Sequence, residues 1–305
     1  MKEYKYSMRQ SISNQNKAYV FAALAIFFWS TVASAFKLSL VYLSPIQLVF
    51  YATLFSIAAL FLIILAQRKL HLLYQYPRAA MARLVPLSLL NPCLYYIVLF
   101  KAYDLLSAQE AMAINYSWVV MMVLLSIPIL KQKMKFKAFL GVVVSYVGVL
   151  IIATKGNLFA LEFGNTLGVI LALSTTVIWA LFWLFNTKKS YDIVVSLFLI
   201  FLFSLPFIVL AVFLGSTFEL PTINGLLGAA YIGLFEMGIT FVLWQSALSH
   251  SSAVARVTSL AFITPFLSLV VLYFVLGEVI MFSTVFGIAF IISGLLVQKL
   301  FSEND

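Results

Sequence analysis

The sequence predicts an all-α integral membrane protein with ten transmembrane helices. Hydrophobic residues make up 64% of the 305 positions and charged residues only 10%, which leaves too little polar surface to cover a soluble globule of this size. A spanning helix needs about 20 predominantly apolar residues, and ten such runs account for most of the chain. No room remains for a soluble domain.

The ten runs follow one another with short connections. We place the spans at 18–36, 45–66, 84–102, 107–130, 137–153, 166–187, 192–214, 224–248, 252–276 and 280–299. The first run follows basic residues and contains Ala33-Ser34-Ala35, as in a cleavable signal peptide. Because this run is long and has a counterpart in the second half of the chain, we expect it to be retained as the first span.

Basic residues predict the orientation, since short cytoplasmic loops carry an excess of lysine and arginine. With the N-terminus inside, sixteen basic residues lie on the inner side and three on the outer side, namely Lys37, Lys101 and Lys155. An even number of crossings then places both termini in the cytoplasm. The net charge of +9 is therefore a topology signal, and the expected partner is the lipid bilayer, not nucleic acid.

An internal repeat divides the chain into two halves. Residues 111–117 align with 253–259 at an offset of 142, Gly141 and Gly148 with Gly287 and Gly294 at 146, and Trp29 with Trp179 at 150. The predicted units are an N-terminal segment 1–17, a first repeat 18–153, an outer linker 154–165, a second repeat 166–299 and a tail 300–305. Five spans per half make the halves cross in opposite directions, as in many secondary transporters.

Glu236 is a carboxylate in the middle of span 8. Such a group costs roughly 2.5 kcal/mol or more when it faces lipid, so it usually faces protein or a water-filled path. On a regular helix its face would hold mostly small residues, namely Gly225, Ala229, Ile232, Gly233 and Thr240. Small residues allow either close helix packing or open volume for a ligand. We favour Glu236 as a polar anchor in a cavity over a packed, hydrogen-bonded and protonated group.

Further polar and aromatic side chains lie inside the predicted spans. Arg256 differs from Glu236 by on the order of 10 Å in depth, so a ligand with both charges could bridge them, or Arg256 could extend to the cytoplasmic interface. The other candidates for a cavity wall are Trp29, Trp179, Trp183, Asn115, Trp118, Asn91 and Tyr95. For the tryptophans, packing in the bundle is an equal alternative.

Lys101 and Glu110 flank the turn between spans 3 and 4 at similar depth. They could pair across this hairpin as an outer latch, although a screened pair at the interface contributes about 1 kcal/mol or less. We therefore expect a structural role for the pair.

Signs of catalysis are missing from the sequence. His71 and His250 lie in predicted cytoplasmic loops, Cys93 lies inside a span, and no phosphate-binding loop or nucleophile elbow is present. We expect no catalytic residue, no metal ligand and no cofactor.

Several segments resemble the drug/metabolite transporter superfamily with two EamA-type repeats. They are Trp29-Ser30-Thr31, Asn115-Tyr116-Ser117-Trp118, Trp179, and Pro265 through Gly277-Glu278 with Gly287 and Gly294 beyond. The resemblance implies a basket of helices around a cavity lined by spans 1, 3, 4, 6, 8 and 9, and Glu278 as a cap on an outer loop. It also implies export of small metabolites by alternating access across a bacterial inner membrane.

The resemblance also bears on substrate and assembly. Trp29-Ser30-Thr31 and Asn115-Tyr116-x-Trp118 are similar to the aromatic amino acid exporter branch, although that branch typically continues Trp-Pro where this chain has Trp118-Val119. We therefore expect a secondary transporter of a small-molecule substrate, such as an amino acid or related compound. Glycines at a spacing of seven would permit a homodimer through spans 5 and 10. The alternatives are a membrane sensor or interaction subunit and a lipid-handling or enzymatic membrane protein.

Overall fold

The computed structural model describes residues 2–131, 135–157, 164–186, 191–218, 220–251, 257 and 260–302, and every regular element within these ranges is a helix. The longer helices of the first half are α1 (Lys2–Leu40), α2 (Pro45–Ala66), α4 (Arg78–Ser88), α5 (Tyr95–Leu105), α6 (Ala108–Asn115), α7 (Trp118–Leu130) and α8 (Phe136–Ala153). Those of the second half are α9 (Thr166–Asn186), α10 (Ile193–Gly215), α11 (Ile223–Tyr231), α12 (Ile239–His250), α14 (Thr264–Leu276) and α15 (Phe282–Ser302).

Four short elements complete the described chain. Helix α3 (Leu70–Tyr74) lies between α2 and α4, and the 3-10 turn η3 (Ala261–Ile263) precedes α14. Two π-helical turns, η1 (Leu89–Leu94) and η2 (Ile232–Glu236), interrupt longer helical segments. These two interruptions position polar side chains inside the bundle.

Seven helical stretches of the described chain are long and apolar enough to cross a membrane. They are Asn14–Leu40, Pro45–Ala66, Arg78–Leu105, Ala108–Leu130, Thr166–Asn186, Ile193–Gly215 and Ile223–His250. Three shorter apolar helices, Phe139–Ala153, Ala261–Leu276 and Phe282–Val297, lie at the places of predicted spans 5, 9 and 10. The helices form a multi-pass membrane protein, and the count of ten spans stays a prediction.

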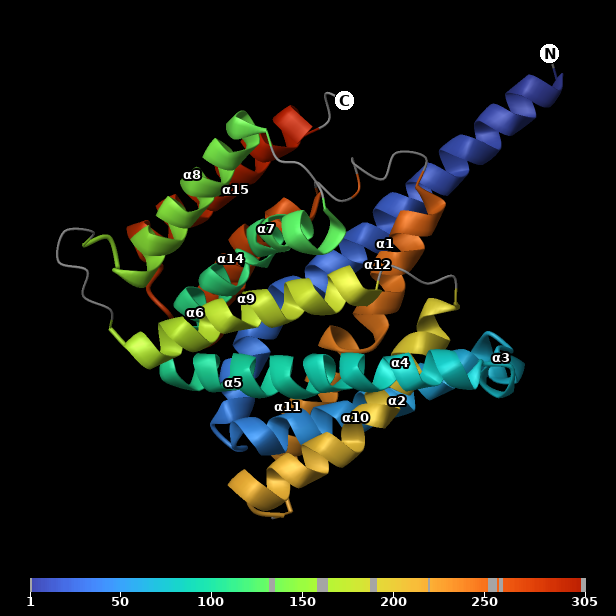
Figure 1. Cartoon of the computed structure of the whole chain (residues 1–305), viewed down its shortest axis with the longest axis horizontal. Coiled ribbons are helices and arrows are strands. Elements are labelled where there is room, and N and C mark those ends of the chain that lie inside the picture. The colour runs from blue at the N-terminus through green and yellow to red at the C-terminus, as the bar shows by residue number, and fades with distance from the viewer. Residues whose placement is uncertain are drawn as a thin grey trace.

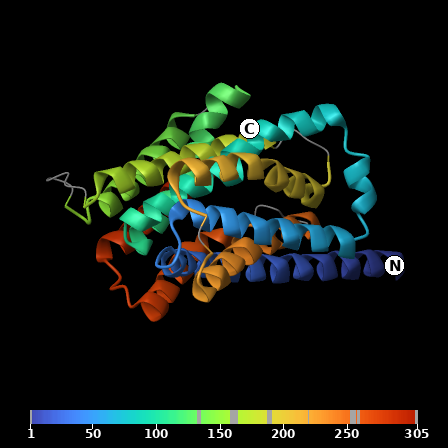
Figure 2. The same cartoon turned by 90° about the horizontal axis from the view of Figure 1, so that it is seen from below.

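The helices pack in groups that bring the two halves of the chain together. α10 lies along α2 and α4, α9 lies along α5 and α7, and α1 packs against α12 and α14. Figures 1 and 2 show these neighbours from two directions, with the N-terminal end of α1 projecting beyond the bundle. Each of these contacts joins a helix of residues 2–153 to a helix of residues 166–302, so neither half buries its apolar faces alone.

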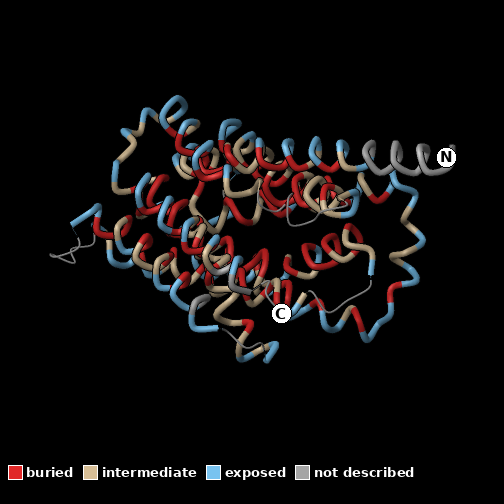
Figure 3. The backbone as a smooth tube through the Cα atoms, turned by 90° about the horizontal axis from the view of Figure 1, so that it is seen from above, coloured by how far each residue is buried: buried red, intermediate tan, exposed pale blue. Residues whose placement is uncertain are grey.

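The core lies where these groups meet. Buried stretches face the middle of the bundle and exposed stretches face outward (Figure 3). The largest fully buried side chains are Tyr96, Phe100, Phe182 and Phe201. Many large apolar side chains are exposed at the periphery, such as Phe213 at 70% and Phe274 at 77%, as expected for a surface that faces lipid tails.

α8 and α15 form a closely packed pair, visible side by side in Figure 1. A Cβ atom at Gly148 would overlap the Gly287 carbonyl oxygen, and one at Gly294 would overlap the Gly141 carbonyl oxygen. The Ser145 hydroxyl donates to the Ile291 carbonyl at 3.0 Å. The glycine faces that we expected to permit a homodimer therefore bring two helices of one chain together. A homodimer through spans 5 and 10 stays a prediction.

Two helices of the bundle begin with a capping box. Ser44 and Gln47 form a capping box at the start of α2, and Ser107 and Glu110 form one at the start of α6. In each box the serine hydroxyl accepts an N–H of the first turn while the longer side chain accepts the serine N–H. The second box holds the Glu110 side chain, which was predicted to pair with Lys101.

Candidate functional site

Two broken helices occupy corresponding places in the two halves of the chain. In the first half, α4 and α5 are separated by η1, where Asn91 has extended backbone angles (φ −143°, ψ 124°) next to Pro92. In the second half, α11 and α12 are separated by η2 and by Gly238 (φ −118°, ψ −90°). Interrupted helices at corresponding positions of two repeats commonly mark the binding site of a transporter.

The break in the second half places Glu236 at the end of η2. Its side chain is buried, with the whole residue only 8% exposed. Tyr96, fully buried on α5, donates its hydroxyl to Glu236 Oε1 at 3.2 Å. The second oxygen, Oε2, is buried and has no hydrogen-bond partner among the described residues. A buried carboxylate oxygen without a donor is costly, so this oxygen is an unpaired acceptor inside the described part of the bundle.

The small residues around Glu236 serve close packing. A Cβ atom at Gly233 would overlap the Ala52 carbonyl oxygen of α2, and one at Gly225 would lie 3.2 Å from the side chains of Tyr42 and Leu43. The prediction of one regular helical face through Thr240 is wrong, because the break at Gly238 changes the rotation of α12. The Thr240 hydroxyl instead donates to the Phe235 carbonyl across the break.

A second set of linked polar side chains lies beside Tyr96. The Tyr95 hydroxyl donates to Asn115 Oδ1 at 3.4 Å, and Asn115 Nδ2 donates to Thr175 Oγ1 at 2.7 Å. Asn115 is the last residue of α6, where the turn at Tyr116 and Ser117 interrupts the fourth span. Side chains from α5, α6 and α9 are thereby joined, two of them predicted site residues.

An aromatic cluster runs from this polar chain through the bundle. Trp179 is its centre, with ring centroids 4.5 Å from Tyr95, 5.9 Å from Trp183, 6.0 Å from Phe241 and 6.3 Å from Trp118. All four predicted tryptophans belong to this aromatic cluster, since Phe241 continues it to Trp29.

Phe241 and Trp244, which contact Trp29 at the far end of the aromatic cluster, were not predicted from the sequence. Trp29 lies 6.4 Å from Phe241 and 5.2 Å from Trp244, centroid to centroid. Trp244 is eight residues after Glu236 and lies beyond the helix break at Gly238. Phe241 and Tyr96 carry no sequence signal of their own, because nothing distinguishes them from other aromatic residues in apolar spans.

Asn91 is also buried without partners. The residue is 0% exposed, and neither its amide nitrogen nor its amide oxygen has a hydrogen-bond partner among the described residues. It lies in η1, which packs against α9 and α10. Its amide is therefore a second unpaired polar group among the described residues. Arg256, by contrast, lies outside the described residues.

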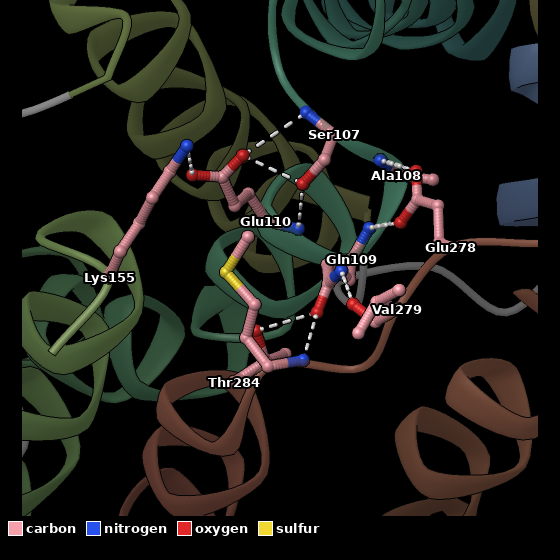
Figure 4. Close-up of polar contacts among 9 residues, drawn as sticks. Ser107, Ala108, Gln109, Glu110, Lys155, Glu278, Val279 and Thr284 are labelled. Carbon is pink, nitrogen blue, oxygen red and sulfur yellow. Dashed lines mark hydrogen bonds and ion pairs between the residues drawn. The ribbon is translucent and has the colours of Figure 1, made fainter. Parts of the chain in front are cut away.

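The predicted pair between Lys101 and Glu110 is wrong. Lys101 pairs with Asp104 of its own helix at 2.6 Å. Glu110 accepts the Ser107 N–H at 3.2 Å and the Ser107 hydroxyl at 2.7 Å, and lies 3.5 Å from Lys155 Nζ (Figure 4). The capping box fixes the Glu110 side chain toward its own N-cap, and an (i, i+3) partner is closer for Lys101.

A different contact joins the two halves at the start of α6. The Glu278 carboxylate accepts the backbone N–H groups of Ala108 at 2.9 Å and Gln109 at 3.2 Å. The buried Gln109 side chain donates to the Val279 carbonyl at 2.9 Å and accepts from Met281 N and from Thr284 Oγ1, both at 3.0 Å. Figure 4 shows both side chains between α6 and the start of α15. The sequence marked Glu278 as a cap but did not indicate which helix it caps.

No group of three His, Cys, Asp or Glu side chains that could hold a metal ion is found among the described residues. Of the charged side chains among the described residues, only Glu110 and Glu236 are buried. Glu110 is paired with Lys155, whereas one carboxylate oxygen of Glu236 has no partner among the described residues.

A multi-pass helical bundle with interrupted helices around a buried carboxylate and an aromatic cluster defines a membrane transporter. A family model described as the EamA-like transporter family matches residues 16–154 and 166–298. The chain belongs to this family, within the drug/metabolite transporter superfamily, and is a multi-pass plasma membrane protein.

Three similar proteins are named as uncharacterized transporters. An uncharacterized transporter of Clostridium kluyveri is 30% identical over 182 residues, 58% of each chain, and one of Acidianus ambivalens is 29% identical over 173 residues, 55% of this chain and 66% of the relative. Both alignments span less than two thirds of the relative. The uncharacterized transporter YdfC of Bacillus subtilis is 26% identical over 258 residues, 84% of this chain and 82% of the relative.

The fold also has a counterpart among solved structures. One crystal structure matches with a TM-score of 0.63 and 20% identity, over 93% of this chain and 97% of the other. At this identity the likeness shows the fold alone.

Proposed function

We propose that the chain is a secondary transporter that exports small organic metabolites, above all amino acids or related compounds, by alternating access. The observation that carries the proposal is the unpaired Glu236 Oε2, buried at a helix break beside the aromatic cluster. A polar anchor next to apolar walls is the usual composition of a small-molecule site. In this proposal the chain spans the membrane ten times as two inverted repeats, with both termini in the cytoplasm.

Each site residue has a role in the proposal. Glu236 binds a cationic group of the substrate or carries a coupling proton, and Asn91 and Asn115 supply hydrogen bonds. Arg256 meets an anionic group. The aromatic cluster, with Trp29, Trp118, Trp179 and Trp183, contacts the apolar part of the substrate. This division follows from the chemistry of the side chains, since a carboxylate accepts from ammonium groups and aromatic faces attract both apolar groups and cations.

The test is efflux from proteoliposomes loaded with a panel of radiolabelled amino acids, amines and neutral metabolites. We expect saturable flux of at least one amino acid or related compound. Repeating the assay after collapse of the proton gradient separates proton coupling from facilitated movement. Absence of flux for the whole panel, with folded protein, would contradict the proposal and favour a membrane sensor or interaction subunit. Chemical conversion of a panel member would favour an enzyme.

Trp179 should contribute to affinity because it is the centre of the aromatic cluster. Replacing it by leucine keeps an apolar side chain but removes the ring contacts, which are worth about 0.5–1.5 kcal/mol. We expect the half-saturation concentration for a transported compound to rise about 2- to 10-fold, with a smaller change in maximal flux. A matched Trp244→Leu variant tests the far end of the aromatic cluster. Equal half-saturation concentrations for Trp179→Leu and the parent would contradict the assignment.

A further inference from the structure

The two oxygens of the Glu236 carboxylate have different surroundings. Among the described residues Tyr96 is the one hydrogen-bond donor to Glu236, with its hydroxyl 3.2 Å from Oε1, while Oε2 has no partner. Tyr96 is 0% exposed, and its ring packs between those of Tyr95 at 4.8 Å and Phe100 at 5.5 Å, centroid to centroid. Packing therefore holds the Tyr96 hydroxyl at Oε1.

The second half of the chain carries a phenylalanine at the position that corresponds to Tyr96. The two helix breaks place Asn91 and Glu236 at an offset of 145 (236 minus 91), and Phe241 follows Tyr96 at the same offset (241 minus 96). The packing of the breaks agrees, since η1 lies against α9 and α10 while η2 lies against α1 and α2. Phe241 is also buried. The fold thus uses an aromatic ring at both positions, and only the hydroxyl is particular to Tyr96.

The occupied oxygen affects which cations Glu236 binds well. A guanidinium group donates two parallel N–H bonds, one to each oxygen of a carboxylate. Because Tyr96 already bonds to Oε1, such a fork must displace the hydroxyl or share its oxygen. An ammonium group is a compact point charge that donates to a single oxygen, and Oε2 is the acceptor without a described partner.

The backbone on both sides of Glu236 is held against α2. A Cβ atom at Gly233 would overlap the Ala52 carbonyl oxygen, and the Ser56 hydroxyl donates to the Met237 carbonyl at 3.0 Å. Together with the bond from Tyr96, these contacts hold the carboxylate in one orientation. A planar guanidinium needs more room beside this buried group than a compact ammonium does.

We propose that Tyr96 is a specificity-determining residue that makes the site select ammonium groups over guanidinium groups. The proposal rests on the proposed function and commits Glu236 to a cationic group of the substrate. Tyr96 acts as a positioning residue, because it holds Oε1 and leaves Oε2 for the substrate. The ring of Tyr95 lies between Tyr96 and Trp179, at 4.8 and 4.5 Å, so an aromatic group on the same compound reaches the aromatic cluster.

The test compares two compounds that differ only in the cationic group, phenethylammonium and phenethylguanidinium. Their dissociation constants are measured by tryptophan fluorescence titration of the full chain in lipid nanodiscs, since all five tryptophans belong to the aromatic cluster. We expect the parent to bind the ammonium compound about 10-fold more tightly, the value of one hydrogen bond to a charged group.

Tyr96→Phe removes the hydroxyl and keeps the ring, as Phe241 does in the second half. We expect the preference for the ammonium compound to fall about 10-fold, because the guanidinium gains its second bond. Tyr76→Phe is the matched control. Tyr76 is 6% exposed, and its hydroxyl also bonds to a side chain of the other half, Ser196 at 3.0 Å. This variant should keep the parental preference.

The outcomes separate this proposal from the proposed function. An unchanged preference in Tyr96→Phe, or an equal change in Tyr76→Phe, would overturn the specificity. If Tyr96→Phe does not fold, the parent decides alone, and equal binding of the two compounds, or binding of neither, would overturn it. Efflux from proteoliposomes is measured separately. The expected preference in a protein that moves neither compound would uphold the specificity and contradict transport, whereas transport with an unchanged preference in Tyr96→Phe would do the reverse.

Discussion

Replacing Glu236 by glutamine should lower the transport of an amine-bearing substrate about 10- to 150-fold. The estimate follows from the loss of a charged hydrogen bond in a buried site, worth about 1.5–3 kcal/mol. The glutamine keeps the size of the side chain and can still accept from the Tyr96 hydroxyl, which now binds Oε1 at 3.2 Å. What it loses is the charge on the oxygen that has no partner.

Stability measurements distinguish this loss from misfolding. Removing a buried, incompletely paired charge is often neutral or stabilising, so the thermal midpoint of Glu236→Gln should equal or exceed that of the parent. Asp104→Asn is the control for flux, because this carboxylate is exposed and pairs only with Lys101. Unchanged efflux in Glu236→Gln, with the midpoint maintained, would remove Glu236 from the site.

A valine at Gly148 should lower the free energy of unfolding by about 2 kcal/mol or more. The first added carbon would already overlap the Gly287 carbonyl oxygen, and Phe290 Cβ would lie 2.9 Å away. Because two backbones meet here, no flexible side chain can move aside, and α8 and α15 must separate. Overpacking of this kind typically costs about 1–3 kcal/mol.

The control for Gly148→Val is Val143→Leu on the exposed side of α8, where the side chain is 44% exposed. Thermal unfolding in detergent and in nanodiscs should show a lower midpoint for Gly148→Val and a parental midpoint for Val143→Leu. Equal midpoints for the two variants would mean that the glycine contact between α8 and α15 contributes nothing to stability.

Sequence patterns were most informative where a single residue determines local structure. The carboxylate of Glu236 stands out because an ionisable group inside an apolar span requires a protein environment. Trp29 and Trp179 stand out because their positions correspond between the repeats. Such features depend only on composition, spacing and the helical period.

Pairings across the bundle could not be predicted in the same way. Lys101 and Glu110 are close in the chain and opposite in charge, yet Lys101 pairs with Asp104 and Glu110 bonds to Ser107 in the capping box. Conversely, Tyr96 looks ordinary in the sequence and Glu278 is indicated only as a cap, yet they contact residues 140 and 170 positions away. Which distant groups meet depends on helix packing, and that packing is a property of all the apolar faces together.

Length, hydropathy and charge distribution by themselves determined that this chain is a multi-pass helical membrane protein, because the cost of burying polar backbone in lipid leaves few other solutions. The repeat and its motifs determined the family. Only the tertiary structure decided that the helix breaks at Gly238, that one carboxylate oxygen of Glu236 has no partner, and that Glu278 caps α6. These features arise from contacts between distant segments, which local sequence preferences do not encode.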